Sequence, residues 1–299
     1  MIKKLIVPLK YIWNHPVTKT NRIFGMFRFF KWQIKASLIA KEQHVNWIEN
    51  LQLNVTKSMH GATGCIYVGL PEFNDMCFLL HYLDTKSTFI DIGANVGVYT
   101  LLAGGIKKCN TISIEPIPQT FNYLEKNIAL NKLGKIVTSY NIGLSDKEGE
   151  LYFTKSKDTI NHVTNKDEGD AIKVKVDTLD NLLQNHTINK TLIKLDVEGF
   201  EYHVLKGAHN TLSNQNLKAL IVELNDCSSK FGLTDEMVDQ LLVDYKFGKF
   251  DYNPLTRKLT KIDKFHREEN TLYIRLSELN TIEQELMNAS PITIYGKKI

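Results

Sequence analysis

The sequence of 299 residues has no uninterrupted apolar run long enough to cross a lipid bilayer, which excludes a typical membrane-spanning protein. We expect no secretory signal, because the apolar stretch after Lys4 is short and ends at Lys10. The four cysteines form no CxxC pair and have no metal-ligand spacing, so we expect reduced thiols. Internal repeats and low-complexity stretches are also missing. Together these absences predict a cytoplasmic protein with an ordinary globular core.

Acidic residues are absent from residues 1–41, where nine positions are Lys or Arg. The rest of the chain holds 28 basic and 33 acidic residues, a net charge of −5, which argues against a nucleic-acid partner. Two roles are open for the basic segment: peripheral contact with an anionic membrane surface, such as the inner face of the membrane, or packing on the acidic body. Apolar residues at three- and four-residue spacing predict a helix there with one apolar stripe: Ile23, Phe27, Phe30, Ile34 and Leu38.

From residue 87 onward, short apolar segments alternate with helical patterns, one of which predicts a helix over 201–212. A hairpin-like strand pair is expected near 150–154 and 171–176, and the pattern ends in a strand pair over 246–252 and 271–275. This alternation predicts an α/β fold, a doubly wound, mostly parallel sheet of Rossmann-like type with helices on both faces. Before it we expect a loop over 61–64, a short strand over 65–68 and a helix from Pro71. The expected organisation is a basic helical extension over residues 1–60, a catalytic domain over 61–280 and a C-terminal tail over 281–299.

The segment 89–100 reads FIDIGANVGVYT, in which a strand reaches Asp91, turns at Gly93 and opens a helix at Gly97. Glycines at these places let a ligand approach the backbone at the start of a helix, as in nucleotide-binding βαβ units. Twenty-four residues after Asp91, the next strand ends at Glu115, whose carboxylate could accept both hydroxyls of a ribose. The combination predicts a nucleoside-containing cofactor.

Electrostatics distinguishes between the possible cofactors. The turn lacks the G-x-G-x-x-G spacing and has G-x-x-x-G instead, and Asp91 would repel the pyrophosphate of a dinucleotide. S-adenosylmethionine carries an ammonium and a sulfonium and no phosphate, so Asp91 favours this methyl donor over NAD. An NAD-linked dehydrogenase on the same fold is the alternative enzyme.

A second group of acids follows two neighbouring strands. Asp196 and Glu198 come directly after the apolar strand 192–195, and Glu223 ends the next strand. Carboxylates at this edge could deprotonate an alcohol, hold a divalent cation or anchor the sulfonium side of the cofactor. We expect Asp196 to act first, with Glu198 and Glu223 behind it, and we assign no metal ligand, although a divalent metal stays possible. Glu201 is expected to be a helix N-terminal acid.

These motifs together resemble the FkbM-type methyltransferases, over roughly residues 60–280. The resemblance implies a class I methyltransferase sheet of seven strands whose last strand is antiparallel. It also implies O-methylation of a hydroxyl on a sugar, a glycan or another natural product, as in polysaccharide biosynthesis. The segments that carry it are 89–100, 113–116 (SIEP), 141–146 (NIGLSD), 176–180 (VDTLD), 193–201 and 221–225.

Carried over by position, the resemblance implies that the glycine turn lines the methionine part of the cofactor and that Glu115 binds its ribose. Asn141 to Leu144 would lie near the adenine, and Asp196 would face the reacting centre. A non-catalytic docking protein that retains the fold is a further alternative, but it predicts loss of the cofactor acids, which are present. The expected cofactor-binding residues are Asp91, Gly93, Ala94, Asn95, Gly97, Glu115, Pro116, Asn141 and Leu144.

Overall fold

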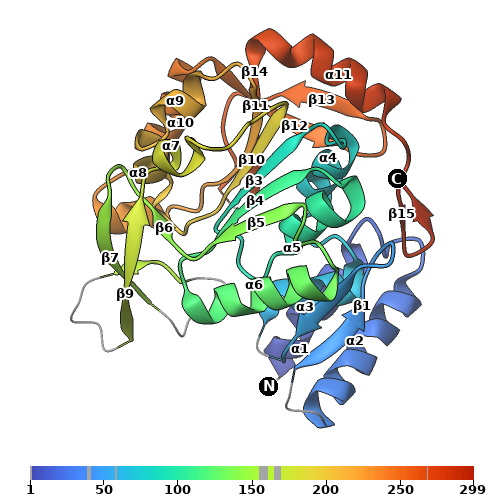
Figure 1. Ribbon diagram of the computed structural model, residues 1–299. Helices are drawn as coiled ribbons and strands as arrows, with labels where there is room; N and C mark the ends of the chain where they lie inside the picture. Colours follow the sequence, from blue (N-terminus) through green and yellow to red (C-terminus); the bar gives the residue numbers. More distant parts are fainter. Residues whose placement is uncertain (1, 39–41, 58, 155–160, 165–169, 268) are drawn as a thin grey trace.

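The computed structural model describes residues 2–38, 42–57, 59–154, 161–164, 170–267 and 269–299 (Figure 1). Its centre is an eight-stranded sheet of order β13-β12-β14-β11-β10-β3-β4-β5. The bounds are β3 Thr88–Ile92, β4 Asn110–Ile114, β5 Val137–Tyr140, β10 Thr191–Leu195, β11 Leu217–Glu223, β12 Phe247–Asn253, β13 Lys258–Lys261 and β14 Asn270–Arg275.

Strand directions confirm the expected doubly wound, mostly parallel α/β sheet. Strands β11, β10, β3, β4 and β5 are parallel to one another, whereas β14 lies between β11 and β12 and is antiparallel to both. The antiparallel last strand is therefore present. The expected strand number needs a correction, because β13 pairs with β12 as an eighth strand at the edge. Its sequence, Lys-Leu-Thr-Lys, has no run of apolar residues that would have predicted it.

Two hydrophobic cores lie on the two faces of this sheet, and alternate residues of the central strands contribute to each. Phe89 and Leu192 belong to one core, while Ile90 and Ile193 belong to the other. The first core is covered by α4 (Phe73–Tyr82), α6 (Pro118–Leu130) and α11 (Leu279–Asn288). The second is covered by α7 (Leu179–Leu183), α8 (Glu201–Lys206), α9 (His209–Ser213) and α10 (Asp235–Asp244).

Two helices differ from expectation. The helix predicted from residue 97 is a short α5 (Val98–Thr100) that continues as a π-helical segment, Leu101–Lys107. The helix predicted over 201–212 is divided into α8 and α9 at Gly207, where a Cβ atom would lie 2.1 Å from the backbone oxygen of Ser145. The close approach of the backbone at Ser145 decides this break, and the sequence around Gly207 contains no signal for that approach.

A smaller sheet of order β6-β9-β7-β8 stands beside the main one. The strand pair expected near 150–154 and 171–176 is present as β7 and β9, which are antiparallel. The bounds are β6 Gly143–Leu144, β7 Gly149–Thr154, β8 Val163–Thr164 and β9 Ala171–Asp177. This sheet carries Leu144 and Phe153 to the side of the main sheet where the site described below lies.

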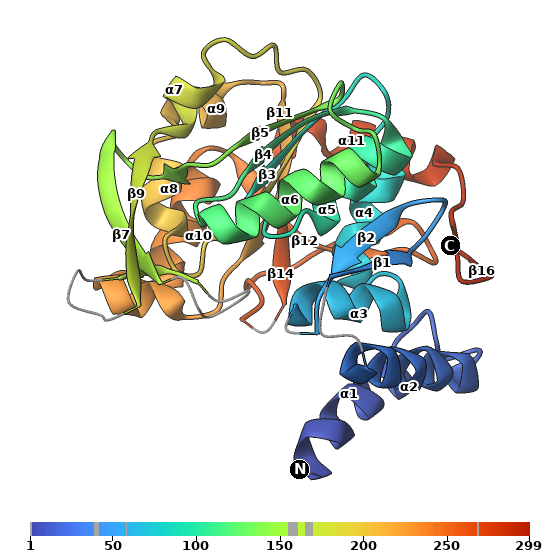
Figure 2. The same ribbon diagram turned by 60° about the horizontal axis from the view of Figure 1, so that its bottom comes forward.

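The N-terminal region begins with the expected helices, α1 (Ile2–Asn14) and α2 (Arg22–Leu38), which Figure 2 shows at the edge of the molecule. Residues 1–60 are not helical throughout, however, because β1 (Gln43–Asn46) and β2 (Gln52–Val55) form a hairpin. The hairpin is held to α6 by Asn127, whose Oδ1 accepts from the backbone N–H of Asn54 at 2.7 Å.

The strand predicted over 65–68 is wrong, since these residues end the helix α3 (His60–Val68), which also replaces the expected loop. Cys65, Ile66, Tyr67 and Val68 are all buried, so their burial shows neither the period of a strand nor that of a helix. Contacts with α2 on one side and the body on the other decide the conformation.

The C-terminal residues also pack into the first core. Helix α11 begins at Leu279, ahead of the tail expected from residue 281, and buries Ile282 and Leu286. The hairpin of β15 (Thr293–Ile294) and β16 (Lys297–Lys298) then reaches the N-terminal helices, where Lys297 Nζ donates to the backbone oxygen of Pro16 at 2.7 Å.

Candidate active site

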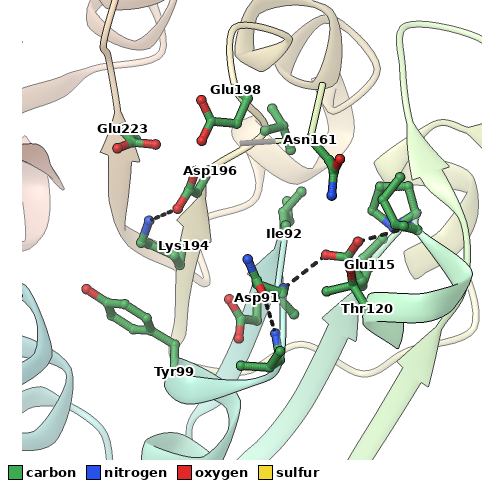
Figure 3. Close-up of a pocket in the computed structure, with 18 of the residues that line it drawn as sticks. Asp91, Ile92, Tyr99, Glu115, Thr120, Asn161, Lys194, Asp196, Glu198 and Glu223 are labelled. Atoms are coloured by element: carbon green, nitrogen blue, oxygen red, sulfur yellow. Dashed lines mark hydrogen bonds and ion pairs between the residues drawn. The ribbon is translucent and has the colours of Figure 1, made fainter. Parts of the chain in front are cut away.

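A cavity of about 360 Å³ opens at the carboxyl ends of β3, β4 and β10 (Figure 3). This is the edge at which doubly wound folds bind their ligands. The lining is acidic, with six carboxyl side chains and one lysine among the described residues. These are Glu72, Asp91, Glu115, Asp196, Glu198, Glu223 and Lys194.

The glycine turn after β3 forms the floor of the cavity. Gly93 has a φ of +80°, and a Cβ atom there would lie 1.8 Å from the backbone oxygen of Asp196. Gly97 has a φ of +90° and packs against Leu124 of α6. Both glycines are therefore required by the positive φ and by close packing of the loop. Gly93, Ala94 and Asn95 line the cavity, whereas Gly97 lies behind its described lining.

Asp91 is almost fully buried, and its Oδ2 accepts a hydrogen bond of 2.6 Å from Thr100 Oγ1. Burial raises the pKa of Asp91 to about 6, against which the hydrogen bond from Thr100 works. Lys194 also favours the charged form of Asp91 from a distance, but burial outweighs both effects. A cationic ligand that contacts the carboxylate directly would supply a closer counter-charge.

Glu115 organises the turn as well as lining the cavity. Its Oε2 accepts from the backbone N–H of Asn95 at 3.0 Å, and its Oε1 accepts from that of Ile117 at 2.9 Å. Burial raises the pKa of Glu115 to about 7. Each oxygen keeps a lone pair for a further donor, so the carboxylate can still accept hydroxyl groups of a ligand.

Asn141 supports the wall instead of forming it. Its Nδ2 donates to the backbone oxygens of Glu115 and Pro116, at 2.8 and 3.0 Å. Among the described residues, the wall consists of Pro116 and of Ile142, Gly143 and Leu144, and Asn141 stands behind them. Leu144 and Pro116 thus lie where a cofactor would be contacted, while Asn141 holds the backbone beside it.

The three predicted catalytic acids are brought together at the other end of the cavity. Asp196 follows β10, Glu223 ends the adjacent β11, and Glu198 stands in the turn after β10 with a φ of +54°. Each offers an oxygen within 4.8 Å of the others. Figure 3 shows the three side chains converging on one space.

Glu201 holds the turn that carries Glu198. Its Oε1 accepts from the backbone N–H groups of Val197 and Gly199, at 3.2 and 3.1 Å. The expectation of a helix N-terminal acid is confirmed by these contacts at the start of α8. The backbone at Glu198 is therefore fixed by its neighbours, including its left-handed conformation.

Lys194 was not predicted as a site residue. Its Nζ lies 2.9 Å from Asp196 Oδ2 and 3.3 Å from Asn270 Oδ1, and the residue is 2% exposed. Burial opposes its charge, but the carboxylates of Asp196, Glu72 and Glu223 raise the pKa of Lys194 above its ordinary value. The sequence did contain a signal for this role, because a lysine within the mostly apolar strand Thr-Leu-Ile-Lys-Leu must be paired with an acid if the strand is buried.

Charge is divided unequally between Asp196 and Glu223. Burial works against ionisation of Asp196, but Lys194 and a hydrogen bond from Glu223 outweigh it and lower the pKa of Asp196. Burial and the neighbouring charge of Asp196 raise the pKa of Glu223 far above its usual range. These directions favour ionisation at Asp196 and a retained proton at Glu223.

Glu72, which begins α4, also enters the site. Its Oε2 accepts from Tyr99 Oη at 2.7 Å and from Asn270 Nδ2 at 2.6 Å. Tyr99 and Asn161 also line the cavity and were not predicted as site residues. The tyrosine ring lies under Lys194, with Nζ 5.4 Å from its centroid.

The donor set fits S-adenosylmethionine. Six carboxyl groups against one lysine favour an ammonium and a sulfonium, and Glu115 is placed to accept hydroxyl donors. The same lining would repel the pyrophosphate of NAD.

Residues 91–251, more than half of the chain, match the sequence model of the methyltransferase FkbM domain. The chain belongs to the FkbM methyltransferase family. The resemblance inferred from the motifs is confirmed, and the chain is a methyltransferase. The NAD-linked dehydrogenase is set aside by this assignment and by the acidic lining of the cavity.

Two curated relatives are similar over part of the chain. Hexuronic acid methyltransferase AglP of Haloferax volcanii is 28% identical over 64% of this chain and 72% of its own length. Methyltransferase sdnD of Sordaria araneosa is 28% identical over 45% of this chain and 65% of its own length.

Among solved structures, the METTL16 methyltransferase domain superposes with a TM-score of 0.46 at 14% identity, covering 87% of this chain and 94% of that one. TYW2 of M. jannaschii, in complex with AdoMet, gives a TM-score of 0.40 at 13% identity, covering 80% of this chain and 88% of that one.

Proposed function

We propose that this methyltransferase transfers the methyl group of S-adenosylmethionine to a neutral hydroxyl of a sugar or glycan. The observation that carries the proposal is the convergence of Asp196, Glu198 and Glu223 at one end of the cavity, with a cofactor-suited turn at the other. In this assignment Asp91, Gly93, Ala94 and Asn95 hold the methionine part. Glu115 and Pro116 hold the ribose and Leu144 the adenine, while Gly97 and Asn141 support the loop and wall.

When bound, S-adenosylmethionine would supply a methyl carbon activated by its sulfonium, so that a C–O bond could form as the S–CH₃ bond breaks and its electrons return to sulfur. The hydroxyl proton of the acceptor would then have to be taken up by a group of the protein. Asp196 is the ionised member of the carboxyl pair, so it accepts this proton. Glu223, already protonated, holds Asp196 by a hydrogen bond, and Glu198 lies beside them as an additional acceptor.

The charge of the site favours a neutral acceptor group. A sugar acid offers both hydroxyls and a carboxylate, and the AglP relative is named for hexuronic acid. A carboxylate placed between Asp196 and Glu198 would be repelled by both, whereas a hydroxyl can donate to either. We therefore propose methylation at oxygen of a hydroxyl, with an ether as the product.

A divalent cation among the three acids is the second candidate role, and their spacing would permit it. Lys194 already supplies a positive charge to Asp196, and Glu223 is protonated, so the cluster is compensated without a cation. We propose proton transfer as the function of the cluster, with Asp196 as the base.

The test is methyl transfer from tritium-labelled S-adenosylmethionine to a panel of sugars, nucleotide sugars and lipid-linked glycans. Mild alkaline hydrolysis followed by mass spectrometry distinguishes the products, because a methyl ester releases the labelled group and a methyl ether keeps it. An ester product would contradict the proposed hydroxyl acceptor.

The role of Asp196 is tested in the same assay with Asp196→Asn. We expect cofactor affinity by isothermal titration to be retained and turnover to fall by about a hundredfold or more. Asp244→Asn, an exposed carboxylate on α10, is the matched control and should leave both unchanged. Full turnover in Asp196→Asn would remove this residue from the mechanism.

A further inference from the structure

The N-terminal helices expose an unusual amount of apolar surface. Ten of the fifteen large apolar side chains that are exposed in the described chain belong to α1 and α2. The six of them on α2 fall on one side of the helix at 100° per residue, and a contiguous exposed apolar patch marks a site of protein or membrane contact. The ten are Ile6, Val7, Tyr11, Trp13, Ile23, Phe24, Phe27, Phe30, Ile34 and Leu38.

Helix α2 has two apolar stripes on opposite sides. At 100° per residue, the stripe that contains Phe27 and Ile34 lies about 180° from the one that contains Phe29 and Trp32. The body covers only the second: Phe29 is 1% and Trp32 is 3% exposed, against 61% for Phe27 and 63% for Ile34. The stripe predicted from the sequence therefore does not pack on the body, which corrects that alternative.

Basic side chains flank the exposed stripe. Lys31 and Lys35 are exposed on α2, and Arg22 lies over the ring of Trp13 at 4.7 Å, which joins the two helices at this surface. No acidic residue occurs in residues 1–41, and no ion pair is made by the basic side chains that the structure describes between residues 6 and 38. Positive charge beside exposed aromatic and aliphatic residues is complementary to an anionic lipid surface.

We infer that the exposed face of α1 and α2 binds the surface of a bilayer containing anionic lipids, with Phe27 and Ile34 entering the headgroup region. No described helix is both long and apolar enough to pass through a membrane, so the contact is interfacial. The face adjoins the cavity, because Tyr11 Oη donates to the backbone oxygen of Pro71, a lining residue, at 2.7 Å. A bilayer bound there lies close to the rim of the active site.

The experiment is flotation of the full chain with vesicles of phosphatidylcholine alone or mixed with phosphatidylglycerol, at low and at high ionic strength. We expect flotation with the anionic vesicles, weakened by salt. Lys31→Gln with Lys35→Gln should weaken partitioning about 30-fold, or about fivefold for each charge. Lys258→Gln with Lys261→Gln, exposed on β13, is the matched control and should behave as the wild type.

The apolar contribution is tested by Ile23→Gln, Phe27→Gln and Ile34→Gln together. All three side chains are more than 60% exposed, so cofactor binding and thermal unfolding should not change while flotation is lost. The control replaces Met237, Leu255 and Met287, which are exposed elsewhere on the body, by Gln.

Flotation that persists in the apolar variant, or that does not depend on anionic lipid, would overturn the inference. The inference would also be overturned if the wild type fails to float and elutes as a dimer while the apolar variant elutes as a monomer. The exposed face would then bind a second copy of the chain.

Discussion

Lys194 Nζ lies 2.9 Å from Asp196 Oδ2, inside a cavity whose other charged side chains, among the residues that the structure describes, are acidic. The ammonium keeps Asp196 ionised by lowering its pKa against the effect of burial. Lys194 thus determines the protonation state of the proposed base, although it stands on the strand and not at its end.

Replacing Lys194 by Met should shift the acidic limb of the kcat–pH profile to higher pH. Without the ammonium the pKa of Asp196 rises, so the base is lost by protonation at a higher pH than in the wild type. Lys194→Arg keeps the charge and should keep the position of the limb. An unchanged profile in Lys194→Met would show that Asp196 does not govern activity.

Replacing Asp91 by Asn should weaken S-adenosylmethionine binding by about 10- to 150-fold, which corresponds to about 1.5–3 kcal/mol for a hydrogen bond to a charged group. The amide can still contact Thr100, so the fold should survive, as circular dichroism would verify. Isothermal titration measures the affinity. Wild-type affinity in a folded variant would mean that the cofactor does not contact Asp91.

Cofactor affinity should fall as pH is lowered. Burial raises the pKa of Asp91 to about 6 and that of Glu115 to about 7 in the free protein. A cationic ligand binds the ionised carboxylates. At a pH below these pKa values each carboxyl group must release its proton before the cofactor binds, so cofactor affinity drops by up to about tenfold per pH unit for each group. Titrations between pH 8 and pH 5 would measure this decline. At the low end of this range, binding should release about one proton from each of the two carboxyl groups. In Asp91→Asn the decline should be shallower.

Replacing Gly93 by Ala should destabilise the protein and abolish cofactor binding. The left-handed conformation alone costs an alanine about 1–2 kcal/mol, and its Cβ would lie 1.8 Å from the backbone oxygen of Asp196. Gly134→Ala is the control, since no atom lies within 4 Å of its Cβ position, and should change stability by less than about 0.5 kcal/mol. Thermal unfolding compares the two.

Treatment with EDTA should leave turnover unchanged. Lys194 and the protonated Glu223 already compensate the charge of Asp196, so the cluster of three acids needs no cation to be stable. Activity that is lost on chelation and restored by a single divalent metal would instead assign Asp196, Glu198 and Glu223 as its ligands.

The sequence by itself determined the sheet and most of the site, because both rest on local requirements. Positive φ at Gly93 and Gly97 demands glycine, and acids at strand ends meet at one edge of a parallel sheet wherever the strands are adjacent. Asp91, Glu115, Asp196 and Glu223 could therefore be named before their distances were known.

Only the tertiary structure decided the features that depend on what covers a residue. Helix α3 is buried on most sides, so its sequence has no period that separates helix from strand. Lys194 is a site residue because Asn270 of β14 and Asp196, which follows the strand of Lys194 itself, both contact its Nζ. Helix α2 carries apolar residues on two faces, and its sequence contains no signal for which one the body would cover. The shape of the neighbouring elements buried Phe29 and left Phe27 exposed.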